Sequence, residues 1–128
     1  MKGVLFLCVH NAGRSQMAAG FMRTLGAGRV QVFSAGSEPA TSLNPIAVAA
    51  MSEVGIDMAS AQPQRWTMDM LHAVDVVVTM GCGDACPYIP GKRYIDWSIT
   101  DPAGKDIVIV RQIRDEIRTR VEQLIAQL

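Results

Sequence analysis

The sequence has no excess of charge of either sign, because 12 lysines and arginines balance 12 aspartates and glutamates. Chains that bind nucleic acid or an anionic membrane over a broad surface usually carry a clear positive excess. The composition therefore gives no case for either kind of partner, and we expect neither. Any attraction for anions must come from a local arrangement of residues.

Long apolar runs are also missing. The apolar stretch at residues 4–8 is soon followed by Asn11 and Arg14, so it falls far short of a signal peptide or a membrane-spanning helix. We therefore expect a cytoplasmic protein. A chain of 128 residues has the length of one domain, spanning 1–128, and such a domain buries roughly two-thirds of its unfolded surface.

Cysteines are few and odd in number: Cys8, Cys82 and Cys86. Because the cytosol keeps thiols reduced, we expect reactive or redox-active thiols, and the alternative for each is a small buried apolar side chain. A zinc site at Cys82 and Cys86 is disfavoured, since a tetrahedral site needs four ligands and only His10 and His72 remain. We predict no metal site and no tightly bound cofactor.

Strand-like and helix-like segments alternate along the chain. Apolar runs rich in β-branched residues predict strands at 4–8, 30–36, 74–80 and 94–97. Apolar residues at helical spacing predict helices at 14–25, 45–54, 68–73 and 110–128. This alternation indicates an α/β fold, a parallel sheet with helices on both faces. In such sheets ligands bind beyond the carboxyl ends of the strands, where Cys8, Met80 and Trp97 stand.

The segment 8–15 has the composition of an anion-binding loop. Five residues separate Cys8, which ends a predicted strand, from Arg14, which opens a predicted helix. A loop of this length can curl until its N–H groups and the helix amino terminus point at one place, and Ala12 and Gly13 are small enough to permit the curl. The planar guanidinium of Arg14 can bind two oxygens of a tetrahedral anion, which a lysine cannot do.

The same positive surroundings make Cys8 the candidate nucleophile, because they favour the thiolate over the thiol at neutral pH. Ser15 is placed to donate its hydroxyl to the sulfur, and Asn11 to brace the loop through hydrogen bonds to main-chain groups. We interpret His10 as a residue that shapes the loop rather than as a catalytic base. The predicted oxyanion-binding residues are Val9, His10, Asn11, Ala12, Gly13 and Arg14.

The motif Cys-x5-Arg-Ser between a strand and a helix near the amino terminus resembles the low-molecular-weight protein tyrosine phosphatase superfamily. The resemblance implies a four-stranded parallel, flavodoxin-like sheet and an acid on a later loop, usually followed by proline. Asp101 and Pro102 stand at the matching place. The proline would fix the turn, and Asp101 would protonate a leaving oxygen. Asp96 is a competing candidate that ranks lower, because it lies within a predicted strand.

The two further cysteines bear on whether the reaction is hydrolysis or reduction. A phosphatase needs only the nucleophile, the arginine and the acid, whereas reduction of arsenate to arsenite requires a second thiol. In the predicted scheme Cys8 attacks arsenate, Asp101 helps a hydroxide to leave, and Cys82 attacks the sulfur of Cys8 and expels arsenite. Cys86 then displaces Cys8 and leaves a Cys82–Cys86 disulfide. The glycines around Cys82 allow the movement that these exchanges require.

A resemblance to the phosphatase-fold arsenate reductases extends along the chain. It is carried by residues 8–17, 33–36, 44–45, 78–80, 86–87, 101–102 and 114–117. It implies arsenate as substrate, with phosphate or sulfate as mimics, a role in arsenic detoxification and an external thiol reductant. Thioredoxin-coupled members often bind potassium through an asparagine, a serine and a glutamate. Asn11 and Ser34 match, but Ala19 stands at the glutamate position, so no potassium site is predicted.

The electron donor stays open between two routes. The short spacing of Cys82 and Cys86, together with residues 91–94 and 96–97, resembles the actinobacterial branch, in which mycothiol attacks the arsenate adduct and a mycoredoxin completes the reduction. On that route, which the sequence slightly favours, both cysteines are spectators. On the other route thioredoxin reduces their disulfide. Two other functions stay open: a low-molecular-weight protein tyrosine phosphatase and, less favoured, a non-catalytic oxyanion-binding regulator.

Overall fold

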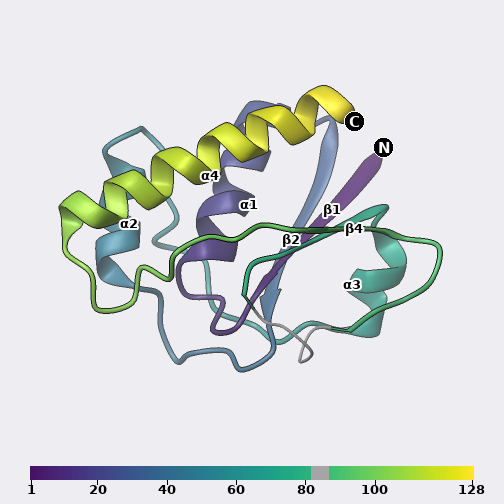
Figure 1. The fold of residues 1–128 in the computed structure, drawn as a ribbon, viewed down its shortest axis with the longest axis horizontal. Helices are drawn as coiled ribbons and strands as arrows, with labels where there is room; N and C mark the ends of the chain where they lie inside the picture. Colours follow the sequence, from purple (N-terminus) through teal and green to yellow (C-terminus); the bar gives the residue numbers. More distant parts are fainter. Residues whose placement is uncertain (82–86) are drawn as a thin grey trace.

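The computed structural model describes residues 1–81 and 87–128 and contains a four-stranded sheet with the strand order β2-β1-β3-β4 (Figure 1). The strands are β1 (Lys2–Cys8), β2 (Val30–Gly36), β3 (Val76–Thr79) and β4 (Arg93–Asp96). Every neighbouring pair is parallel. The predicted parallel α/β class is confirmed.

Helices cover both faces of the sheet, as predicted (Figure 1). They are α1 (Arg14–Gly26), α2 (Pro45–Ser52), α3 (Met68–Ala73) and α4 (Ile107–Gln127). One face carries α1 and α4, with α2 packed against α4, and the other face carries α3. The central strands β1 and β3 are therefore buried from two sides, which is why they read as continuous apolar runs rather than as alternating ones.

The central strand β1 divides its side chains between two cores. Val4, Phe6 and Cys8 pack with α1 and α4, whereas Leu5 and Leu7 pack on the side of α3. All five side chains are almost fully buried. Because alternate residues of a strand point to opposite faces, Cys8 emerges on the face of the sheet that α1 covers.

The helix starts follow capping side chains. Asn44 accepts hydrogen bonds from the N–H groups of Ile46 (2.9 Å) and Ala47 (3.3 Å), which confirms the predicted cap and the Pro45 start. Asp106 accepts from the N–H of Ile109 at 3.0 Å, so α4 begins at Ile107, earlier than the predicted start at residue 110. The predicted start was late because the buried apolar residues of α4 begin only at Val110.

Several other predicted boundaries were wrong by one or two residues. The third strand begins at Val76 rather than at 74, because Val74 caps α3 and its carbonyl accepts from the Lys92 ammonium at 2.7 Å. The fourth strand ends at Asp96, although the N–H of Trp97 still donates to the carbonyl of Thr79 at 2.8 Å while its ring packs against Phe6. The helix α2 ends at Ser52, before the turn that Gly55 closes with a φ of 80°.

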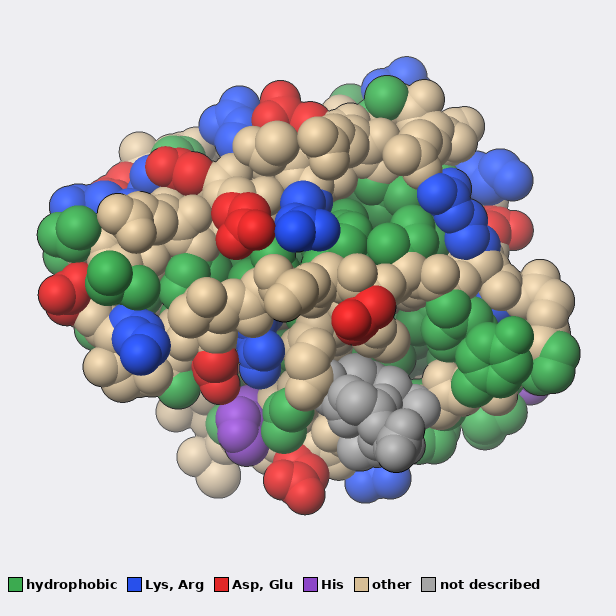
Figure 2. Space-filling view, in the orientation of Figure 1, with side chains coloured by type: hydrophobic (Ala, Val, Ile, Leu, Met, Phe, Trp, Pro, Cys, Tyr) green, Lys and Arg blue, Asp and Glu red, His purple; other side chains and the backbone are tan. Residues whose placement is uncertain are grey.

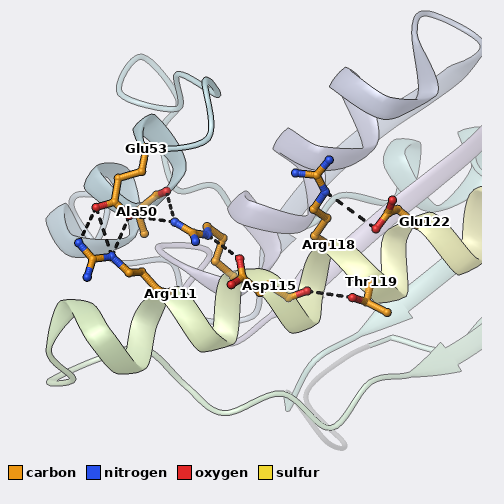
Figure 3. A network of polar contacts seen from close by, with 8 residues as sticks. Ala50, Glu53, Arg111, Asp115, Arg118, Thr119 and Glu122 are labelled. Atoms are coloured by element: carbon orange, nitrogen blue, oxygen red, sulfur yellow. Dashed lines mark hydrogen bonds and ion pairs between the residues drawn. The ribbon is translucent and has the colours of Figure 1, made fainter.

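A network of ion pairs joins α2 to α4 (Figure 3). The Glu53 carboxylate, just after α2, accepts from Arg111 at 2.7 Å and from Arg114 at 2.9 Å. Arg114 is buried and also donates to the carbonyl of Ala50 at 2.9 Å. The last turn of α2 thus gains cationic donors where its carbonyls lack helical partners.

Charged side chains of both signs are interspersed on the face shown in Figure 2. That distribution agrees with the balanced composition of the chain. Within residues 1–81 and 87–128, no helix has the length and apolar content that crossing a membrane requires.

Candidate active site

The loop between β1 and α1 turns its carbonyl groups outward, onto the chain that follows β2. Four N–H groups of that chain donate to the loop: Ser37 to Cys8 (3.3 Å), Glu38 to Val9 (2.8 Å), Ala40 to His10 (3.0 Å) and Asn44 to Ala12 (2.9 Å). In a planar trans peptide the N–H points away from the C=O. The N–H groups of the loop therefore face its concave side, which is the predicted anion seat.

The curl of the loop depends on a left-handed residue, on a close approach at a glycine and on a hydrogen bond from a histidine ring. Asn11 is fully buried and has a φ of 51°, in the left-handed region that asparagine tolerates better than most residues. Gly36 lies so near the loop that an added Cβ would stand 2.5 Å from the carbonyl oxygen of Val9. The Nδ1 atom of His10 lies 3.0 Å from the carbonyl of Glu38, so this nitrogen carries the proton and the ring helps to hold the loop.

The sulfur of Cys8 is buried and lies among hydrogen-bond donors. The N–H of Asn11 is 3.3 Å away and the hydroxyl of Ser15 is 2.9 Å away. The side-chain amide of Asn11 donates to the Ser15 oxygen at 2.7 Å, so the serine proton is left for the sulfur. Two donors thus converge on one sulfur atom, an arrangement that suits an anionic acceptor.

The guanidinium of Arg14 lies between this loop and the segment that precedes α4. It is 8% exposed and donates to the carbonyl of Ile99 at 3.4 Å. Its second nitrogen lies 3.6 Å from the carboxylate of Asp101, whose side chain is 48% exposed. The other oxygen of Asp101 accepts from the N–H of Ala103 at 3.0 Å, which fixes the carboxylate at the mouth of the site.

Pro102 closes one side of the site by packing directly on the loop. A Cβ added at Gly13 would stand 2.7 Å from its ring, so only glycine allows this contact. The remaining pocket has a volume of about 50 Å³, room for a compact ion rather than an extended ligand. Its lining residues are Cys8, His10, Ala12, Gly13, Arg14, Asn44, Asp101, Pro102 and Ala103.

The structure brings together the predicted loop, Cys8, Arg14, Ser15 and Asp101. It does not bring Asp96 to them, because that carboxylate accepts from the Thr79 hydroxyl at 2.8 Å at the ends of β3 and β4. Predicted residues Cys82 and Cys86 lie outside the described residues.

Gly81, the last described residue before that segment, borders the site. A Cβ added there would stand 2.6 Å from the Nη1 atom of Arg14. The position also has a φ of 87°, which favours glycine. The chain therefore passes directly beside the guanidinium just before Cys82.

Two residues that contact the loop were missed by the sequence analysis. Gln16 donates to the Oδ1 atom of Asn11 at 3.0 Å, and so does the main-chain N–H of Gln64. No motif marks either residue, since Gln16 looks like any polar helix residue and residues 59–64 form no helix or strand. In the described part of the chain, no three His, Cys, Asp or Glu side chains are grouped so that they could hold a metal ion.

Residues 3–128, nearly the whole chain, match the low molecular weight phosphotyrosine protein phosphatase family. The chain belongs to this family. The resemblance inferred from the Cys-x5-Arg-Ser motif is thereby confirmed. This family member is 39% identical over 131 residues to a protein of Synechocystis sp. named glutaredoxin arsenate reductase, covering 100% of this chain and 99% of that protein.

Solved structures of similar proteins share the fold of this family member. A thioredoxin-dependent arsenate reductase of Corynebacterium glutamicum superposes with a TM-score of 0.85 at 40% identity. The match covers 99% of this chain and 60% of that one. A structure described as an arsenate reductase in the phosphate binding state also gives a TM-score of 0.85, at 38% identity, covering 99% of this chain and 98% of that one.

Proposed function

We propose that this chain reduces arsenate to arsenite, with Cys8 as the nucleophile and detoxification of arsenic in the cytoplasm as its role. The observation that carries the proposal is the convergence of inward N–H groups, the Arg14 guanidinium and the Cys8 sulfur on one pocket of about 50 Å³. Such a site suits a compact tetrahedral oxyanion. The names of the similar proteins favour arsenate among the possible oxyanions.

The first step is attack of the Cys8 thiolate on arsenic. The new sulfur–arsenic bond forms as one hydroxyl group of arsenate leaves, and Asp101 supplies the proton with which that hydroxyl departs as water. Its position at the mouth of the pocket, 3.6 Å from Arg14, supports this role. Arg14 and the loop N–H groups hold the remaining oxygens. Arsenic stays pentavalent in this step.

The second step is the reduction. A second thiolate attacks the sulfur of Cys8, a disulfide forms, and the electron pair of the sulfur–arsenic bond stays on arsenic, which leaves as arsenite. We propose Cys82 as that thiol and Cys86 as the one that releases Cys8. The proximity of Gly81 to Arg14 supports the choice, because Cys82 is the next residue.

We further propose that a thioredoxin-like or glutaredoxin-like dithiol protein then reduces the Cys82–Cys86 disulfide. Glutaredoxin and thioredoxin occur in the names of two similar proteins, which supports this route. Mycothiol with mycoredoxin stays the alternative. On that route mycothiol attacks Cys8 in place of Cys82.

The test is an arsenite-release assay on three single variants: Cys8→Ser, Cys82→Ser and Cys86→Ser. We expect Cys8→Ser to abolish arsenite release with any reductant, because the oxygen of serine cannot form the disulfide. With thioredoxin and its reductase we expect both other variants to be inactive. Full activity of Cys82→Ser with mycothiol and mycoredoxin would select the alternative route.

A phosphatase assay distinguishes the proposed reductase from the two alternative functions. Turnover of p-nitrophenyl phosphate by the wild type and by Cys82→Ser alike, with no arsenite from either under any donor, would replace the reductase by a phosphatase. Phosphate binding without either activity would leave a non-catalytic oxyanion-binding protein.

A further inference from the structure

Asn11 has both lone pairs of its side-chain oxygen occupied by donors. The Nε2 atom of Gln16 and the main-chain nitrogen of Gln64 each lie 3.0 Å from Oδ1. Asn11 is fully buried and Gln16 is 3% exposed, so water does not replace either contact. The amide of Asn11 is thereby oriented, with Oδ1 toward Gln16 and Nδ2 toward Ser15, 2.7 Å away.

The orientation of Gln16 is fixed in turn by a main-chain group. Its Nε2 atom donates a second hydrogen bond, of 3.2 Å, to the carbonyl oxygen of Gln62. A main-chain carbonyl can only accept, so a flipped Gln16 would set its oxygen against two other oxygens. The side chain of Gln16 therefore has to be a donor to Asn11.

Each hydrogen bond fixes the donor-to-acceptor direction of the next one, up to the sulfur of Cys8. Gln16 donates to Asn11, Asn11 donates to Ser15, and the single proton of the Ser15 hydroxyl is left for the sulfur of Cys8, 2.9 Å away. If Asn11 were flipped, its oxygen would face Ser15 and would take that proton. Cys8 would then lose one of its two donors.

We propose that Gln16 is a positioning residue that directs the Ser15 hydroxyl onto the sulfur of Cys8. It acts through Asn11 and touches no substrate. The inference rests on the proposed role of Cys8 as the nucleophile, because the hydrogen bond that it controls matters only for an ionised sulfur. The relay consists of the hydrogen bonds from Gln16 to Asn11, from Asn11 to Ser15 and from Ser15 to Cys8. Its direction is fixed by residues outside the loop.

The test replaces the donor by an acceptor of the same shape, Gln16→Glu, or by a neutral side chain of similar length, Gln16→Met. The measurement is the rate of alkylation of Cys8 by iodoacetamide against pH, followed on the Cys8 peptide by mass spectrometry so that Cys82 and Cys86 do not interfere. We expect the midpoint of the profile for Gln16→Glu to rise by about one pH unit, which corresponds to roughly tenfold slower alkylation at pH values well below both midpoints. We expect a smaller rise for Gln16→Met.

The Ser15→Ala background separates the relay from a direct effect of the new charge. If Gln16 acts through Ser15, adding Gln16→Glu to Ser15→Ala shifts the profile no further. A full additional shift would mean that the glutamate repels the sulfur directly, and would overturn the proposal. Gln31→Glu, the same substitution on β2, provides the matched control and should keep the wild-type profile.

Phosphate affinity is the second readout, because Arg14 and the loop N–H groups do not depend on the relay. We expect both Gln16 variants to bind phosphate within about twofold of the wild type. If Gln16→Glu fails to fold, Gln16→Met carries the test. Unchanged alkylation profiles in the folded variants would refute the relay even if the protein reduces arsenate, and shifted profiles would support it even if arsenate is not the substrate.

Discussion

Arg14 combines burial with a planar group that faces the pocket. Arg14→Lys keeps the charge but removes the paired hydrogen bonds, so we expect phosphate affinity to fall by tenfold or more, on the order of 1.5–3 kcal/mol for one lost charged hydrogen bond. Titration calorimetry with phosphate measures it. Arg23→Lys on the same helix is the control and should bind normally. Equal affinity of Arg14→Lys and the wild type would remove Arg14 from the site.

Substitutions at Gly81 and Gly91 test the close approach of the main chain to the Arg14 guanidinium. Both have a positive φ, of 87° and 90°, but an added Cβ meets Arg14 only at Gly81 and meets nothing within 4 Å at Gly91. We expect Gly81→Ala to weaken phosphate binding by displacing the guanidinium, and Gly91→Ala to cost only backbone strain, about 1 kcal/mol. Calorimetry with phosphate measures the displacement of the guanidinium, and thermal unfolding of both variants measures the backbone strain. Similar phosphate affinities would contradict the displacement.

At the scale of elements, the ion pairs between α2 and α4 make stability depend on pH. The hydrogen bond from Arg111 and, with it, that from Arg114 lower the pKa of Glu53 from its ordinary value to about 2. A lowered carboxyl pKa stabilises the fold above the unfolded-state value, and this stabilisation is lost as the pH falls.

We therefore expect Glu53→Gln to reduce the free energy of unfolding near neutrality and to flatten its fall between about pH 4.5 and pH 2. Urea titrations at several pH values measure this, and added salt should reduce the difference, because these side chains are partly exposed. Glu122→Gln, whose pair with Arg118 is longer at 3.9 Å (Figure 3), is the control. Parallel pH curves for Glu53→Gln and the wild type would contradict the expectation.

The boundaries of the elements show where local patterns stop being informative. The capped start of α2 at Pro45 was predictable, because Asn44 and Pro45 are local signals. The start of β3 was not, because the carbonyl of Val74 is taken by Lys92, a residue from another part of the chain. Periodicity locates the packed core of an element, and its ends depend on distant partners.

At the scale of the whole molecule, the site joins three segments that are distant in the sequence: the β1–α1 loop, the chain after β2 and the turn at Asp101. An anion that bridges them should stabilise the entire fold. At a phosphate concentration 100 times the dissociation constant we expect about 2.7 kcal/mol of added stability and a rise of roughly 10 °C in the unfolding temperature. Sulfate should act similarly and chloride should not. A thermal scan without any rise would contradict the site.

The sequence by itself determined the class of fold and indicated a candidate anion-binding loop, with candidate roles for Cys8, Arg14 and Ser15. It could do so because strand and helix periods, glycine and proline signals and a spaced motif are local properties of the chain. A family resemblance added Asp101 as the candidate acid, and Asp96 ranked lower because it lies within a predicted strand.

Only the tertiary structure decided which way the hydrogen bonds run. The outward carbonyls of the loop, the contact of Gly81 with Arg14 and the donation from Gln16 to Asn11 depend on partners that no spacing reveals. A side-chain amide can present either its oxygen or its nitrogen, and the choice is made by whatever packs against it. That neighbour is fixed by the folded chain, so the direction of each bond is a tertiary property.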